Sequence, residues 1–176
     1  LQAFQFSKKQ QRLFRQNAGF TIINKPIVLT DELEDLYVHY KSSLSFEPAT
    51  TIAEWLFGEE RDKNIFDTHA IEVRDGDSLI AVGIYDLGKN SIAGIMNFYN
   101  PDYKKFSLGK YLVLLKAKHA MATNRHWYYP GYITYGYPAF DYKLFLGEEN
   151  IEMFVPELNG WQGYNKTLVD HLTSNM

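Results

Sequence analysis

Apolar residues recur with two different periods along this chain, and the change between them predicts its helices and strands. Spacings of three and four residues predict helices over 7–17, from Thr30, from Thr51 and over 107–122. Alternation of apolar and polar residues predicts strands over 20–28, 69–74, 78–86 and 91–99. Weaker signals predict a tyrosine-rich strand over 127–134, a short strand over 151–155, a glycine-rich turn at 160–163 and a C-terminal helix from Asn165.

Capping and turn residues indicate where these elements begin and end. Hydroxyl side chains that precede predicted helices are those of Ser7, Thr30 and Ser107. The string Thr-Ile-Ala-Glu at 51–54 fits a capping box, and Gly58 is expected to end that helix. The tight-turn string Asp-Gly-Asp at 75–77 predicts that the strands on either side pair as an antiparallel hairpin, the first part of a three-stranded meander.

The order of these elements indicates an α+β protein with a central, mostly antiparallel sheet flanked by helices. We expect one domain over 1–176, with a basic helix at 1–19, a core at 20–160 and a C-terminal helix at 161–176. The β-β-β-α-β order of its centre is similar to that of the GNAT-like acyltransferase fold. Many α+β domains share this order, so the order alone does not indicate an activity.

Composition and charge exclude several classes of function. The 176 residues contain no cysteine, which excludes a disulfide framework, a thiolate metal site and a cysteine nucleophile within them. The five histidines lack metal-ligand spacing, and we expect neither metal nor cofactor. No apolar run approaches the roughly 20 residues of a membrane helix. The net charge of -3 disfavours a general nucleic-acid coat protein, but cations gather at 8–15 and 104–118.

Several short strings carry a more specific signal because they occur in a consistent order. They read Phe4-Gln5-Phe6-Ser7-Lys8-Lys9-Gln10-Gln11-Arg12, Arg15-Gln16-Asn17, Leu36-Tyr37-x-x-Tyr40, Phe98-Tyr99-Asn100-Pro101-Asp102, Ser107-Leu108-Gly109-Lys110-Tyr111, Gly131-Tyr132 and Pro138-x-x-x-Tyr142-Lys143. Over about residues 4–160, this set resembles the aminoacyl-tRNA–protein transferases, the arginyl- and bacterial leucyl-transferases that act on protein N-termini.

The chain also departs from the pattern of that family. Asn100 stands where the family usually has Asp, Tyr137 stands where it has Cys, and Ala139-Phe140 replace Lys-Met. The 176 residues hold no counterpart of the family's Cys-rich N-terminal module. These departures leave the substrate specificity and the activity open.

The resemblance implies transfer of an amino acid, Arg or Leu, from aminoacyl-tRNA to the N-terminal amine of an acceptor protein beginning with an acidic residue. This would be a cytoplasmic tagging reaction of the N-degron type. Aminolysis of the ester needs a neutral amine, a path for its proton and donors for the oxyanion, but no cysteine, metal or covalent intermediate.

Two alternatives stay open, and the sequence gives no oligomeric state. One is a non-catalytic peptide- or RNA-binding module with the same fold. The other is an acyl-CoA N-acyltransferase. It is disfavoured because the helix entry has only one glycine, Gly109, and because the bulky Tyr111 would crowd a pyrophosphate.

The resemblance and the local chemistry together select candidate site residues. The catalytic candidates are Asp102, Tyr99 and Tyr132. Asp102 would either accept the amine proton or end a turn, and Tyr99 would either stack on the terminal adenine or line the amino-acid pocket. The candidates for substrate binding are Ser107, Gly109, Tyr111, Tyr142 and Lys143, and those for tRNA binding are Lys8, Lys9, Arg12, Arg15, Lys104 and Lys110. An ordinary capped helix with solvated lysines fits the same residues.

Overall fold

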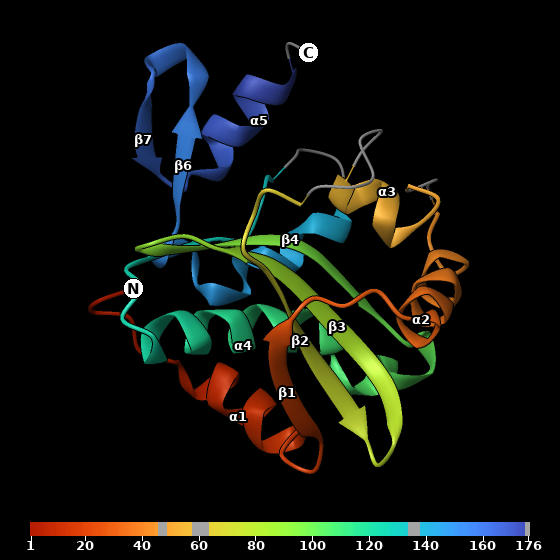
Figure 1. Ribbon diagram of the computed structural model, residues 1–176. Helices are drawn as coiled ribbons and strands as arrows, with labels where there is room; N and C mark the ends of the chain where they lie inside the picture. The colour runs from red at the N-terminus through yellow and green to blue at the C-terminus, as the bar shows by residue number, and fades with distance from the viewer. Residues whose placement is uncertain (46–48, 58–63, 134–137, 175–176) are drawn as a thin grey trace.

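The computed structural model describes residues 1–45, 49–57, 64–133 and 138–174, and a five-stranded sheet forms its centre (Figure 1). The strands are β1 (Thr21–Pro26), β2 (Thr68–Asp75), β3 (Ser78–Leu87), β4 (Ser91–Tyr99) and β5 (Trp127–Tyr129), and they lie in chain order across the sheet. The first four strands pair antiparallel, and β5 pairs parallel to β4. The expected α+β class, with its mostly antiparallel sheet and flanking helices, is confirmed.

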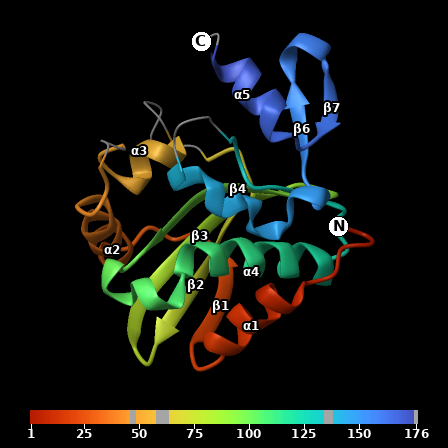
Figure 2. The same cartoon turned by 180° about the vertical axis from the view of Figure 1, so that it is seen from behind.

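Helices cover both faces of this sheet because its strands carry apolar side chains on both faces. On one face lie α1 (Lys8–Gln16) and α4 (Leu108–Ala122), and on the other lie α2 (Asp31–Lys41) and α3 (Ile52–Phe57) (Figures 1 and 2). Consecutive residues of a strand point to opposite faces. Ile71 accordingly packs in the cluster that contains α4, whereas its neighbour Ala70 packs in the cluster that contains α2.

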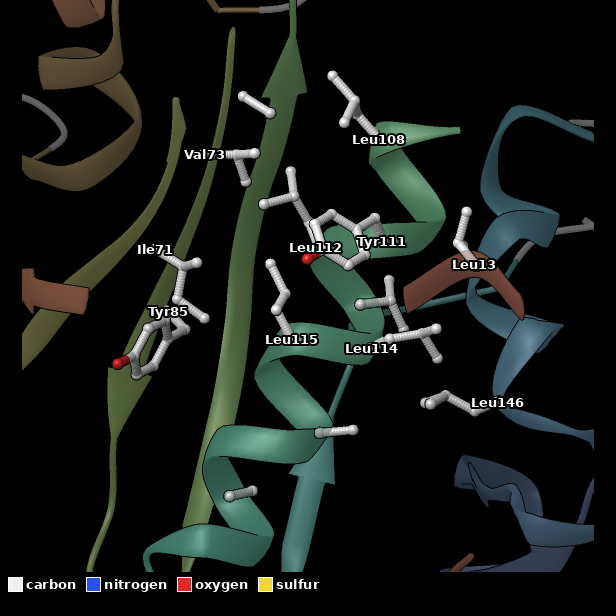
Figure 3. Close-up of a cluster of buried hydrophobic side chains, with 14 of the residues drawn as sticks. Leu13, Ile71, Val73, Tyr85, Leu108, Tyr111, Leu112, Leu114, Leu115 and Leu146 are labelled. Carbon is white, nitrogen blue, oxygen red and sulfur yellow. The ribbon is translucent and has the colours of Figure 1, made fainter. Parts of the chain in front are cut away.

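The largest apolar cluster joins α4 to segments that are distant in the sequence. Figure 3 shows Leu13 of α1 and Leu146 approaching the side of α4 that carries Leu114. Nearly the whole circumference of α4 is buried, rather than the single apolar stripe that the spacing predicts, because chain segments pack on it from several sides. Packing on several sides therefore holds α4, including its first turn, in a fixed position.

The predicted helix starts are confirmed for three helices and need a correction for α4. Ser7 forms a capping box with Gln10, the Thr30 hydroxyl accepts from the N–H of Leu33, and the Thr51 hydroxyl accepts from the N–H of Glu54. Ser107 precedes α4 as expected, but its backbone is left-handed, with φ 50°, and its side chain makes no capping hydrogen bond with the described residues. The first turn of α4 therefore keeps N–H groups that the Ser107 side chain does not satisfy.

The C-terminal part differs most from the prediction. Short 3-10 segments η1 (Pro101–Phe106), η2 (Pro138–Leu146), η3 (Glu148–Asn150) and η4 (Pro156–Leu158) connect the larger elements. The residues expected to form a glycine-rich turn are instead strand β7 (Gly160–Gly163), which pairs with β6 (Glu152–Val155) in a separate two-stranded sheet. The turn lies earlier, where Asn159 adopts a left-handed φ of 43°.

The final helix, α5 (Lys166–Ser174), begins directly after Asn165, where the sequence predicts it. Strand β5 ends at Tyr129, although the pattern predicted a strand that continues to residue 134. Gly58, Thr134, Tyr135 and Tyr137 lie outside the described residues. Within the described ranges, no helix is long and apolar enough to cross a membrane.

Candidate active site

The candidate site is a pocket at the start of α4, next to the place where β4 and β5 separate. Among the described residues, the two strands pair from Ser91 to Ala93 on β4, and the second half of β4 contacts other segments. A pocket of about 300 Å³ opens beside it. Its lining comes from four separate parts of the chain and consists of Tyr40, Asn97, Tyr99, Lys104, Ser107, Gly109, Lys110 and Tyr142. Six of the residues selected from the sequence are thereby brought together, and Tyr40 and Asn97 are added to them.

Glycine at position 109 allows an aromatic ring to lie against the first turn of α4. A Cβ atom at Gly109 would lie 3.2 Å from Cε1 of Tyr99, closer than ordinary van der Waals contact. The Tyr99 ring therefore forms a wall of the pocket directly over the helix start. Backbone N–H groups at a helix N-terminus stabilise negative charge, so an anionic or oxyanionic ligand atom is favoured at this end of the pocket.

Tyr40, Tyr99 and Tyr142 give the pocket aromatic walls that also carry hydroxyl groups. The ring centroids of Tyr40 and Tyr99 are 5.1 Å apart, and the Asn97 side chain donates a hydrogen bond of 3.3 Å to the Tyr142 hydroxyl. Burial raises the pKa of all three phenols above the ordinary value. They therefore stay protonated at neutral pH, and they can donate hydrogen bonds to a ligand but cannot act as bases.

A buried lysine lies beneath the pocket wall, although in the sequence it is one of the cations gathered at 104–118. Lys116 is 0% exposed, and its Nζ donates to the carbonyl oxygens of Ile84 at 2.7 Å and Met96 at 3.1 Å. The pairing of β3 with β4 shifts register at Ile84, where a β-bulge interrupts the ladder. The ammonium group thus hydrogen-bonds to two carbonyls at the bulge. Asn97 and Tyr99, which line the pocket, follow this bulge along β4.

Burial lowers the pKa of Lys116 to about 7, and the charge of Lys143 contributes to this shift. Among the described residues, no carboxylate forms an ion pair with Lys116. The position of Lys116 in the sequence indicates that its side chain lies on the buried side of α4. Residue 116 lies four positions after Leu112 and eight after Leu108, on the apolar side of α4.

Two of the selected residues, Tyr132 and Lys143, line a second, larger groove instead. Lys143 is 5% exposed, and its Nζ donates to the carbonyl oxygen of Tyr132 at 2.7 Å and lies 4.7 Å from the centre of the Tyr132 ring. Burial lowers the pKa of Lys143 to about 8. Because Tyr142 lines the small pocket and Lys143 lines the groove, the two cavities lie on either side of the same short segment of η2.

Two further candidates, Asp102 and Tyr111, line neither of these two cavities. The Asp102 side chain is 81% exposed, and its backbone N–H donates to the Asn100 side chain at 2.9 Å, so Asp102 belongs to the turn that follows β4. Its distance to the His39 ring is 3.8 Å. Tyr111 is 4% exposed and packs against Phe14 in the core, because its place on α4 turns it away from the pocket.

The selected cations form a basic surface that reaches the rim of the pocket. Lys8, Lys9, Arg12 and Arg15 are exposed on α1, and Lys104 is exposed at the pocket itself. The ammonium groups of Lys9 and Lys110 lie 5.2 Å and 5.3 Å from the centre of the same Phe145 ring. Phe145 therefore joins the basic face of α1 to the lysine at the pocket rim.

Within the part of the chain that the structure describes, no group of three or more His, Cys, Asp or Glu side chains is placed so that it could hold a metal ion.

Comparison with known proteins identifies the family. Residues 32–151 match the family described as "Arginine-tRNA-protein transferase, C terminus". The chain belongs to this family. All the residues that line the small pocket lie within the matched range, whereas α1, β7 and α5 lie outside it.

Similar curated proteins carry the name aspartate/glutamate leucyltransferase. The one from Leptospira interrogans is 26% identical over 166 residues, which covers 92% of this chain and 64% of the relative. Those from Shewanella sp. (28% identical) and Pseudomonas entomophila (27% identical) align with 75% and 78% of this chain and with 56% and 59% of their own length. The chain thus spans less than two thirds of the length of these relatives.

Proposed function

We propose that the small pocket binds the aminoacylated 3′ end of a tRNA and transfers its amino acid to the N-terminal amine of an acceptor protein. The observation that carries the proposal is the continuity between the pocket and the basic face of α1 through Lys9, Phe145 and Lys110. A phosphate backbone crossing α1 would contact these cations, and its single-stranded end would reach rings on which bases stack.

The transfer follows from the chemistry of an activated ester. The acceptor amine attacks the ester carbonyl, the C–N bond forms, the C–O bond to the ribose breaks, and the ribose oxygen leaves with the proton given up by the amine. The negative charge that develops on the carbonyl oxygen is stabilised by phenolic O–H groups of Tyr99 and Tyr142 and by backbone N–H groups at the start of α4. A reaction of this kind takes place in the cytoplasm, where charged tRNA is available.

Between the two candidate amino acids, the lining of the pocket favours leucine over arginine. None of the described lining residues is acidic, and Lys104 and Lys110 are both cationic. An arginyl side chain would be repelled by these lysines and would find no carboxylate, whereas a leucyl side chain would pack against the tyrosine rings.

The acceptor we propose begins with Asp or Glu. Lys143 lies one residue from the pocket lining and provides a positive charge on the side where the acceptor would approach. The names of the relatives agree with an acidic acceptor residue.

The test is transfer of radiolabelled leucine or arginine from purified charged tRNA to peptides that begin with Asp, Glu or Lys. We expect label from leucyl-tRNA on the Asp and Glu peptides, and little on the Lys peptide. Transfer of arginine alone would contradict the assignment of leucine. Binding of tRNA or peptide without transfer of either amino acid would identify a non-catalytic module and refute the proposal.

A further inference from the structure

The larger groove has the features of a binding site for an extended polypeptide. It has a volume of about 810 Å³ and lies between the segment that contains β5 and the β6–β7 hairpin with α5. Its lining includes Trp127, Tyr129, Phe154 and Trp161, which are 40–52% exposed. Aromatic surface gathered in a groove is costly to leave in water and is typical of an interaction site.

The aromatic rings form a continuous wall that joins the two sides of the groove. The ring centroid of Trp161 lies 5.9 Å from that of Tyr129 and 5.6 Å from that of Phe154. Tyr129 belongs to the main sheet, whereas Phe154 and Trp161 belong to the hairpin. A ligand in the groove would therefore contact both sheets.

The charge around the groove distinguishes among possible occupants. Glu149, Glu152 and Glu157 line it as exposed acids, and Lys143 lies within it with its ammonium hydrogen-bonded to a backbone carbonyl. Three carboxylates repel an RNA backbone and attract a cationic ligand. Apolar walls with an acidic rim complement a polypeptide segment that carries both apolar and basic side chains.

The position of the groove connects it with the proposed chemistry. Tyr142 lines the pocket and the next residue of η2, Lys143, lines the groove, so the two cavities are neighbours on either side of this segment. We propose that the groove binds the segment that follows the first residue of the acceptor protein, and that it selects apolar and basic side chains there. This inference rests on the proposed transfer function, and it assigns a role to β7 and α5, which lie outside the family match.

Peptide binding to the whole 176-residue chain, without tRNA, tests the inference. Two of the three tryptophans line the groove, so quenching of tryptophan fluorescence reports its occupancy. The probes are two peptides that begin with Glu, one continuing Leu-Phe-Arg-Leu-Lys and the other Gly-Asp-Ser-Gly-Asp. We expect the first to bind about tenfold or more tightly than the second.

Matched variants locate the binding. Trp161→Ala should weaken binding of the apolar, basic peptide by about tenfold, whereas Phe66→Ala, at a ring that is 60% exposed outside the groove, should leave it unchanged. Glu152→Lys should weaken it severalfold, and Asp35→Lys, an exposed acid elsewhere, should not.

Equal affinity for the two peptides, or equal effects of Trp161→Ala and Phe66→Ala, would overturn the inference. So would a CCA-ended oligonucleotide whose binding depends on Trp161, or a self-association that Trp161→Ala abolishes. Amino-acid transfer without the peptide preference would refute the groove assignment alone. The preference without any transfer would support peptide docking and refute the proposed function.

Discussion

Replacement of Lys116 by methionine should change how the stability of the protein depends on pH. The side chain is fully buried, and its amine donates to the carbonyl oxygens of Ile84 and Met96. Methionine has a similar length and fills most of the same space, but it has no proton to release and no hydrogen bond to donate. The substitution therefore separates the titration of the amine from its packing.

The size and sign of the effect follow from the lowered pKa of Lys116. Its value is about 7 in the folded chain and 10.5 in the reference state, so between these values the unfolded chain holds a proton that the folded chain has released. Stability must therefore rise with pH across this window, and the integrated gain is about 5 kcal/mol from this group. The variant loses this gain, and it also leaves two buried carbonyls without their donor, at a cost of about 1–3 kcal/mol each.

Urea unfolding at a series of pH values from 7 to 10 would measure the effect, with Lys118→Met as the control because Lys118 is exposed on the same helix. Lys143 also has a lowered pKa, about 8, and titrates in the same direction, so the quantity to compare is the difference between wild type and variant. That difference should grow by several kcal/mol as the pH rises. Parallel curves for wild type and Lys116→Met would refute the reasoning.

Three further substitutions test the packing, the capping and the pocket. Gly83→Ala places a Cβ 2.9 Å from Cε of Lys116 and should lower the free energy of unfolding by about 1–3 kcal/mol in urea titrations; an unchanged midpoint would contradict this packing. Ser7→Ala removes the cap of α1 and should lower the free energy of unfolding by about 1 kcal/mol, measured by thermal unfolding. An unchanged melting temperature would contradict this cap. Gly109→Ala places a Cβ 3.2 Å from the Tyr99 ring, so it should slow amino-acid transfer severalfold while leaving stability equal or higher; unaltered transfer kinetics would argue against this pocket.

The sheet and its helices could be predicted from the sequence because local signals there agree with the tertiary contacts. Asp75-Gly76-Asp77 supplies a residue with positive φ, 58° at Gly76, and alternating apolar residues run on both sides of it. The hairpin at 152–163 could not be predicted in the same way. Its glycines resemble a turn, and its strands are held by pairing with each other rather than by a buried alternating pattern.

The candidate site could be predicted only in part because sequence spacing does not give the direction of each side chain. Tyr99 and Gly109 belong to strings of the family, and they meet in the structure. Tyr111 belongs to the same string but points into the core, and Asp102 points into solvent. Lys116 was missed because a lysine is ordinarily exposed, and only the bulge in the sheet gives its amine two partners inside the protein.

The most direct test of the central proposal is the single-turnover rate of leucine transfer, from saturating leucyl-tRNA to a peptide that begins with Glu. The double variant Tyr99→Phe/Tyr142→Phe keeps both rings and removes both hydroxyl groups from the pocket. Tyr103→Phe is the matched control, because its hydroxyl donates to Asp75 outside the pocket. We predict that the double variant reduces the rate by about a hundredfold, with tRNA binding retained, and that the control does not. Equal rates for wild type and the double variant would contradict the assignment of the reaction to this pocket.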